Sequence, residues 1–127
     1  MSLFEKEVEW KNVLEILISA RKAIKTDDIL LLKELSNRTV HSSSIYKDAD
    51  AIAIAVTIYA LAKIVERKKY TEYRDWPSFF SRVTKNIDKA IEFVKTKDIM
   101  AFRDCMLDIR KSVNKLTGHL KIYIQDI

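Results

Sequence analysis

Glycine and proline are almost missing from this chain. Its 127 residues contain one glycine, Gly118, and one proline, Pro77. The turns of β-rich proteins depend on both residue types, so their scarcity argues against an all-β or loop-rich fold. It also excludes motifs that need several glycines, such as the P-loop, the dinucleotide-binding fingerprint and the nucleophile elbow of serine hydrolases. We therefore expect long helices and no ordinary nucleotide-dependent enzyme.

Cysteine and histidine are also scarce. Cys105 is the only cysteine, which excludes a disulfide framework and favours a buried structural thiol over a redox or nucleophilic role. The two histidines are His41 and His119. His41 with Asp48 and Asp50 could supply three ligands, but their spacing matches no standard zinc or di-iron pattern. We expect no metal site and no cofactor.

Charged residues make up 32% of the chain and leave a net charge of +5. A basic excess favours anionic partners such as nucleic acid or acidic lipid. Acidic residues are interleaved throughout, however, which is typical of an ordinary solvated surface. Abundant lysine and glutamate with a single glutamine are typical of hyperthermophile proteins. The charged N-terminus does not match a signal peptide, and we expect a cytoplasmic protein.

Residues 49–65 are apolar on almost every side. A helix without a polar face must be covered by other helices or by lipid. Asp50 lies near one end and Lys63 near the other, and a stretch of 17 residues is at the lower limit for a membrane span. The other expected helices each carry an apolar stripe that needs a partner. We therefore predict a core helix and no membrane insertion.

Apolar residues at alternating spacings of three and four predict the other helices. We expect helices over about 3–25, from 29 onward, 48–67, 76–95 and 98–124, with capping carboxylates at Asp28, Asp48 and Asp98. The end of the second helix stays open between Ser36 and Ser44, because polar side chains there compete for backbone hydrogen bonds. No tandem repeat or linker is apparent. The expected fold is all-α: a single-domain, antiparallel five-helix bundle with a central, largely buried third helix.

A run of polar residues precedes the apolar helix. Histidine exchanges a proton readily near neutral pH, and hydroxyl groups can bind phosphate or sugar oxygens. The predicted ligand-binding residues are Ser36, Asn37, His41, Ser42, Ser44, Tyr46 and Asp48. The alternative is structural: these side chains satisfy one another and cap helix ends near the core.

The spacing Asn37-x-x-x-His41, followed by Tyr46, resembles part of the motif of the HEPN superfamily. Those proteins are small all-helical bundles, many of them metal-independent ribonucleases or toxin components. The resemblance implies His41 as a general acid or base and Asn37 as the residue that orients it. The family motif has an arginine directly before the asparagine, whereas this chain has Ser36 there and Arg38 on the other side. Residues 36–67 are also similar to helical proteins of archaea, a resemblance that implies no activity.

A basic stretch with aromatic residues follows the apolar helix. Cations contact phosphates and tyrosines stack on bases, so single-stranded RNA is a chemically reasonable ligand. The predicted nucleic-acid-binding residues are Arg67, Lys68, Lys69, Tyr70, Tyr73 and Arg74. The alternative is a solvated helix end, since Glu66 and Glu72 dilute the charge.

Three hypotheses follow for the function. The leading one is a small helical binding or interaction module whose partner is RNA or another anion. The second is an HEPN-like ribonuclease that uses His41 and Asn37. The third is a structural subunit that forms a homodimer through the apolar seam of the last helix.

Overall fold

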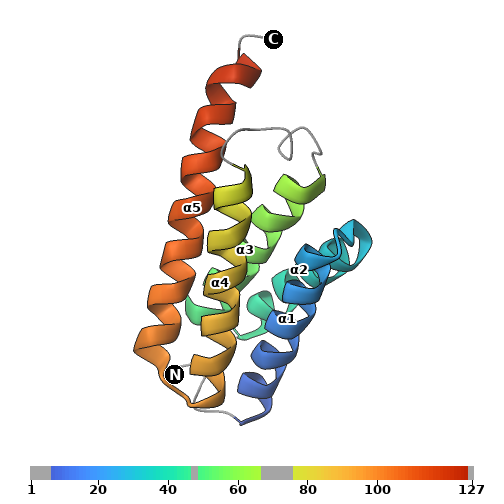
Figure 1. Ribbon diagram of the computed structural model, residues 1–127. Coiled ribbons are helices and arrows are strands. Elements are labelled where there is room, and N and C mark those ends of the chain that lie inside the picture. Colours follow the sequence, from blue (N-terminus) through green and yellow to red (C-terminus); the bar gives the residue numbers. More distant parts are fainter. Residues whose placement is uncertain (1–6, 47–48, 67–75, 126–127) are drawn as a thin grey trace.

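The computed structural model describes residues 7–46, 49–66 and 76–125, and within them side chains at 10–39, 50, 52–66 and 76–116. The described residues form α-helices and no strand (Figure 1). The helices are α1 Glu7–Lys25, α2 Ile29–Tyr46, α3 Ala49–Glu66, α4 Trp76–Lys95 and α5 Ile99–Gln125. The predicted all-α fold with five helices is confirmed.

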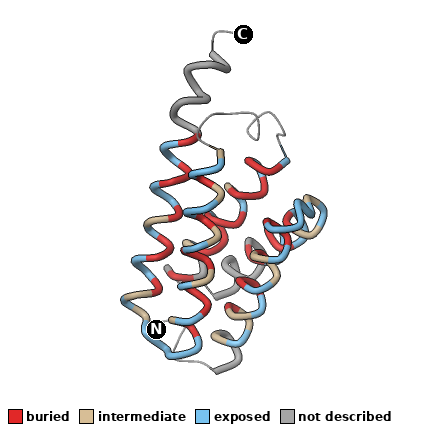
Figure 2. Tube along the Cα trace, viewed as in Figure 1, coloured by how far each residue is buried: buried red, intermediate tan, exposed pale blue. Residues whose placement is uncertain are grey.

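The helix contacts close a ring. α1 packs against α2, α2 against α3, α3 against α5, α5 against α4, and α4 against α1. The buried sides of the helices face one another across this ring (Figure 2). Each helix has one broad apolar face, and packing against two neighbouring helices removes that face from water. The apolar positions at spacings of three and four face inward: Trp10, Phe80 and Ile99 are partly buried, and the following are fully buried: Val13, Leu17, Ala20, Ile24, Val83, Ile87, Ala90, Val94, Phe102, Met106, Ile109, Val113 and Leu116.

Helix α3 is one member of this ring and is not surrounded on every side. Its inner positions are buried, among them Ile54, Ile58 and Leu61, as expected for a core helix. Its outer face is about half exposed, however, at Ile52 (48%), Val56 (53%) and Tyr59 (51%). The third helix is thus largely buried, as predicted, but this face stays open because α2 and α5 flank α3 and no other helix is packed substantially on it within the described residues.

Two tight turns join the helix pairs, and both were predicted. The Asp28 carboxylate accepts the Leu31 N–H at 3.0 Å, and the Asp98 carboxylate accepts the Ala101 N–H at 3.2 Å. Each aspartate thus caps the helix that follows it. The residue before each cap, Asp27 or Lys97, has a left-handed backbone with φ of 53° or 59°. That conformation ends the preceding helix and lets the chain reverse.

The sequence left the end of the second helix undecided, and the structure places it at Tyr46. The buried Thr39 hydroxyl donates to the carbonyls of Leu35 and Ser36 at 2.9 and 3.0 Å, so it is satisfied inside the helix. No glycine or proline interrupts this segment, and packing against α3 outweighs its low intrinsic propensity. The cap predicted at Asp48 lies outside the described residues. None of the described helices is long and apolar enough to cross a membrane.

Candidate functional site

The predicted ligand-binding run lies mainly on α2. Ser36, Asn37, His41, Ser42, Ser44 and Tyr46 are all helical. Ser36 is buried and Asn37 is exposed, whereas the side chains of the other four, and all of Asp48, lie outside the described part. Of the predicted ligand-binding residues, only Ser36 and Asn37 can be placed together within the described side chains.

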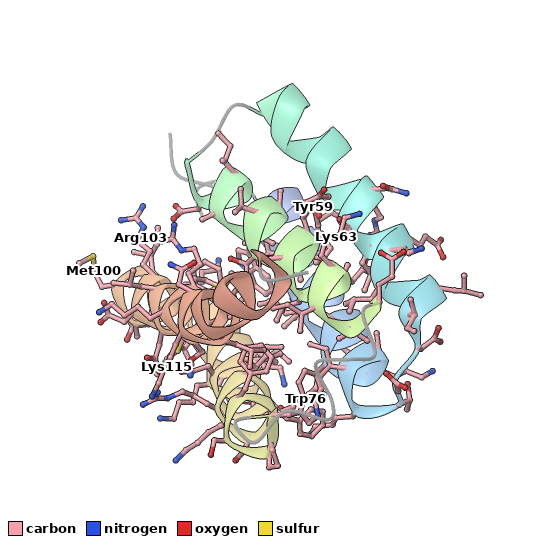
Figure 3. The ribbon with its side chains drawn as sticks, turned by 90° about the horizontal axis from the view of Figure 1, so that it is seen from above. Tyr59, Lys63, Trp76, Met100, Arg103 and Lys115 are labelled. Atoms are coloured by element: carbon pink, nitrogen blue, oxygen red, sulfur yellow. The ribbon has the colours of Figure 1, made fainter. Side chains whose placement is uncertain are left out.

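Those two residues line a small hollow between α2 and α3. Its volume is about 180 Å³, and its other lining residues are Lys33, Tyr59, Ala62, Lys63 and Glu66. The ammonium of Lys33 lies 2.8 Å from Glu66 Oε1, and that of Lys63 lies 3.9 Å from Glu66 Oε2. Lys63 also sits 5.5 Å from the centre of the Tyr59 ring; both residues project from the exposed side of α3 (Figure 3).

This hollow is poorly suited to a ligand. Pockets for small molecules usually enclose roughly 300–1,000 Å³, and the 180 Å³ here is well below that range. The cations are also partly neutralised by Glu66, so little positive charge is left for an anion. The hollow therefore supports the structural interpretation of Ser36 and Asn37 better than the ligand-binding one.

The HEPN-like ribonuclease hypothesis gains no support from the neighbouring residues. Ser36, which stands where the family has arginine, is 4% exposed. The guanidinium of Arg38 lies 3.5 Å from Glu15 of α1, on the surface. The side chain of His41 lies outside the described residues, so its proposed role stays a prediction.

The apolar seam of the last helix faces inward. Phe102, Met106, Ile109, Val113 and Leu116 are buried within the chain itself. Their apolar surface is already used by α4 and α3 and is closed to a second copy. Leu120, Tyr123 and Ile127, which continue the seam, lie outside the described side chains, and the homodimer stays a prediction.

Two separate hollows of about 360 and 560 Å³ lie between α4 and α5, and together we call them the α4–α5 furrow. The first is lined by Ser78, Phe79, Arg82, Ser112, Lys115 and Leu116. The second is lined by Asn86, Lys89, Phe93, Ala101, Asp104, Cys105, Leu107, Asp108 and Lys111. Residues 78, 82, 89 and 93 recur at helical spacing, so both hollows open on the same side of α4.

Cations are concentrated on this α4–α5 furrow. Arg82 and Lys89 line it from α4, Lys111 and Lys115 line it from α5, and the exposed Lys85 lies between the two α4 residues. Lys115 projects from α5 on the side where α4 lies (Figure 3). Within the described part of the chain, none of these five has a carboxylate within 4 Å. Between α1 and α4, by contrast, Arg21 and Lys25 share Asp88.

The acidic residues of the furrow are fewer than its cations. Asp108 accepts a hydrogen bond from the Asn86 amide at 2.8 Å, and Asn86 also donates to the Arg82 carbonyl at 3.0 Å. The bond to Asp108 joins α4 to α5, whereas the bond to Arg82 lies within α4. Asp104 is the other carboxylate in the lining. The furrow therefore keeps a positive excess, with the half-buried ring of Phe93 at one end.

Cys105 lies at the bottom of the second hollow and is 6% exposed. Burial raises the pKa of its thiol above the ordinary 9.0; Lys89 opposes this rise, whereas Asp104 and Asp108 add to it. Lys89, Asp104 and Asp108 all line this hollow. The expectation of a buried thiol is confirmed.

We predict that Cys105 reacts slowly with iodoacetamide at pH 8 in the folded protein and fast in urea, because only the exposed thiolate is nucleophilic. A pKa above its unfolded value means that the thiol contributes stability below about pH 9, and that this contribution is lost as pH rises through the folded pKa. Mass spectrometry against time measures the rate. Equal rates with and without urea would contradict the burial.

Sequence reasoning missed the furrow and selected Arg67, Lys68, Lys69, Tyr70, Tyr73 and Arg74, which lie outside the described residues. A signal was present in the sequence. Positions 82, 85 and 89 are cations at helical spacing, and positions 111 and 115 are cations one turn apart. The two sets of cations form one surface only because α4 and α5 lie side by side, and the sequence alone does not show that the two helices are neighbours.

Comparisons with known proteins give no relative. No family model matches the chain, and neither a curated protein nor a solved structure is significantly similar to it. The described side chains also contain no group of three or more potential metal ligands. The class defined by the structure is thus an all-α five-helix bundle with a basic furrow.

Proposed function

We propose that this protein is a binding module for nucleic acid and that the α4–α5 furrow is its binding surface. The observation that carries the proposal is the cluster of five cations without ion-pair partners among the described residues: Arg82, Lys85, Lys89, Lys111 and Lys115. Unpaired cations along a groove supply the sequence-independent attraction that most nucleic-acid binding depends on.

The furrow fits a single strand better than a duplex. Seven residues separate Arg82 from Lys89, which corresponds to about 10 Å along a helix, so the furrow offers cations over a few consecutive phosphates. Its floor contains apolar side chains and the Phe93 ring, and bases of a single strand can stack on an aromatic ring. A duplex would present its phosphates on a broad convex surface and leave this floor empty.

The test is binding of a fluorescein-labelled 20-nucleotide oligo-uridine, followed by anisotropy at several salt concentrations. If each of the four cations that line the two hollows contacts one phosphate of a single strand, affinity should fall about 50-fold between 50 and 200 mM salt. An oligo-thymidine of equal length separates RNA from DNA as the preferred strand. Absence of binding at 50 mM salt, or affinity independent of salt, would overturn the proposal. Equally tight binding of poly-glutamate would assign the furrow to an acidic protein.

The same samples test the ribonuclease hypothesis. We expect the oligo-uridine to remain intact after prolonged incubation, as seen on a denaturing gel. Cleavage that disappears in His41→Ala would favour an HEPN-like enzyme over a binding module.

A further inference from the structure

The two helix pairs joined by tight turns have the same construction. In the first, the N–H of Asp28 bonds to the Ala23 carbonyl and that of Asp27 to the Ile24 carbonyl. In the second, residues exactly 70 positions later make the same bonds: Asp98 to Phe93 and Lys97 to Val94. The turns also share lysine, threonine, aspartate and isoleucine at equivalent places, residues 25, 26, 28 and 29 and residues 95, 96, 98 and 99.

The resemblance extends along both helices of each pair. When residues 10–39 are placed on residues 80–109, 24 of the 30 positions have the same degree of burial, and none is buried in one pair and exposed in the other. Equivalent positions hold Ala20 and Ala90, which are both completely buried. Since the match continues through the turn without a shift, we infer that α1–α2 and α4–α5 are two copies of one helical hairpin.

Helix α3 is held in the same way by both hairpins. Lys33 of α2 pairs with Glu66 at the end of α3. Its equivalent in the second hairpin, Arg103 of α5, pairs with Asp50 at the start of α3. Equivalent positions of the two hairpins thus each supply a cation, one to each end of α3. This similarity supports the duplication independently of the turns.

The hairpins differ at the exposed positions of their first helix. Arg82, Lys85 and Lys89 correspond to residues 12, 15 and 19 of α1, which are asparagine, glutamate and serine. Because the first hairpin folds with neutral and acidic residues at these places, the scaffold does not require cations there. These three cations are therefore a property of the second hairpin alone.

We propose that Arg82, Lys85 and Lys89 are the residues that give the second hairpin its affinity for the phosphates of a single nucleic-acid strand, and that the first hairpin lacks this affinity. This inference rests on the proposed function. It goes further in assigning the binding to one copy of a duplicated hairpin and to three positions within it.

The test compares two variants with equal loss of charge. R82Q/K85Q/K89Q removes two cations that line the furrow together with the exposed Lys85 between them, and K11Q/K22Q/K95Q removes three exposed cations that line neither hollow. For oligo-uridine at 50 mM salt, we expect the first variant to bind at least about 20-fold more weakly and the second less than about 3-fold. A third variant, R82N/K85E/K89S, places the residues of the first hairpin in the second and should lose affinity to at least the same extent.

The outcomes are distinguishable. If the unaltered protein does not bind the strand, the proposed function fails. If it binds and R82Q/K85Q/K89Q retains full affinity, these three residues do not supply the affinity and the present inference is overturned, whereas the protein is still a nucleic-acid-binding module. Equal losses in the two glutamine variants would also overturn it, since only net charge would then matter. Thermal unfolding by circular dichroism checks that each variant is folded; the glutamines keep long side chains at positions already exposed to water.

Discussion

Replacing Arg103 with methionine should lower the free energy of unfolding by about 2–3 kcal/mol. The guanidinium holds both oxygens of Asp50, with Nε 2.9 Å from Oδ1 and Nη2 2.9 Å from Oδ2. The Asp50 side chain is only 8% exposed, so the substitution removes a main partner of a buried carboxylate. Losing one partner of a fully buried pair costs about 3–5 kcal/mol, and the half-exposed Arg103 reduces that figure.

The duplicated hairpin supplies a matched control. Lys33 is the equivalent of Arg103, and it pairs with Glu66, but both of these side chains are substantially exposed, at 47% and 38%. Lys33→Met should therefore cost less than about 1 kcal/mol, as surface ion pairs usually do. Urea denaturation followed by circular dichroism measures both variants. Equal effects would show that burial of the carboxylate does not decide the cost. The double variant D50L/R103M, which removes both charges, should recover much of the lost stability.

The fold was predictable because it depends on local rules. Apolar spacing of three and four placed α4 at residues 76–95, as observed, and carboxylates at Asp28 and Asp98 marked two helix starts. The exposed face of α3 was not predictable in this way. Ile52, Val56 and Tyr59 are as apolar as the residues on the buried side, so hydrophobicity alone cannot tell which side the neighbouring helices leave open.

The furrow and the duplication escaped sequence reasoning for different reasons. The furrow is formed by two helices, and each contributes cations that look like an ordinary solvated face when read alone. The hairpins share only the turn and scattered core residues, because core positions tolerate exchanges such as Leu32 for Phe102 that preserve burial. Burial and backbone hydrogen bonds keep the repeat visible after most side chains have diverged.

Truncation of Phe102 to alanine should lower the free energy of unfolding by about 3–5 kcal/mol. Its ring is 1% exposed and belongs to the core shared by the helices. Because α1 packs on α4, and α3 packs on both α2 and α5, we expect the loss to be felt by both hairpins. This tests the predicted single domain: one core should give one cooperative transition.

The two tryptophans lie in different hairpins, although Lys97 of the second turn sits 5.3 Å from the centre of the Trp10 ring. Trp10 belongs to α1 and Trp76 to α4, where it contacts the Phe79 ring at 5.5 Å between centroids. W76F leaves the first reporter and W10F leaves the second; the latter change is tolerable because the buried Trp10 Nε1 has no hydrogen-bond acceptor among the described residues. In urea followed by fluorescence, F102A should shift both midpoints equally. Phe102 and Trp76 belong to the same hairpin. If only the midpoint reported by Trp76 shifted, the two hairpins would unfold independently and would not form one cooperative unit.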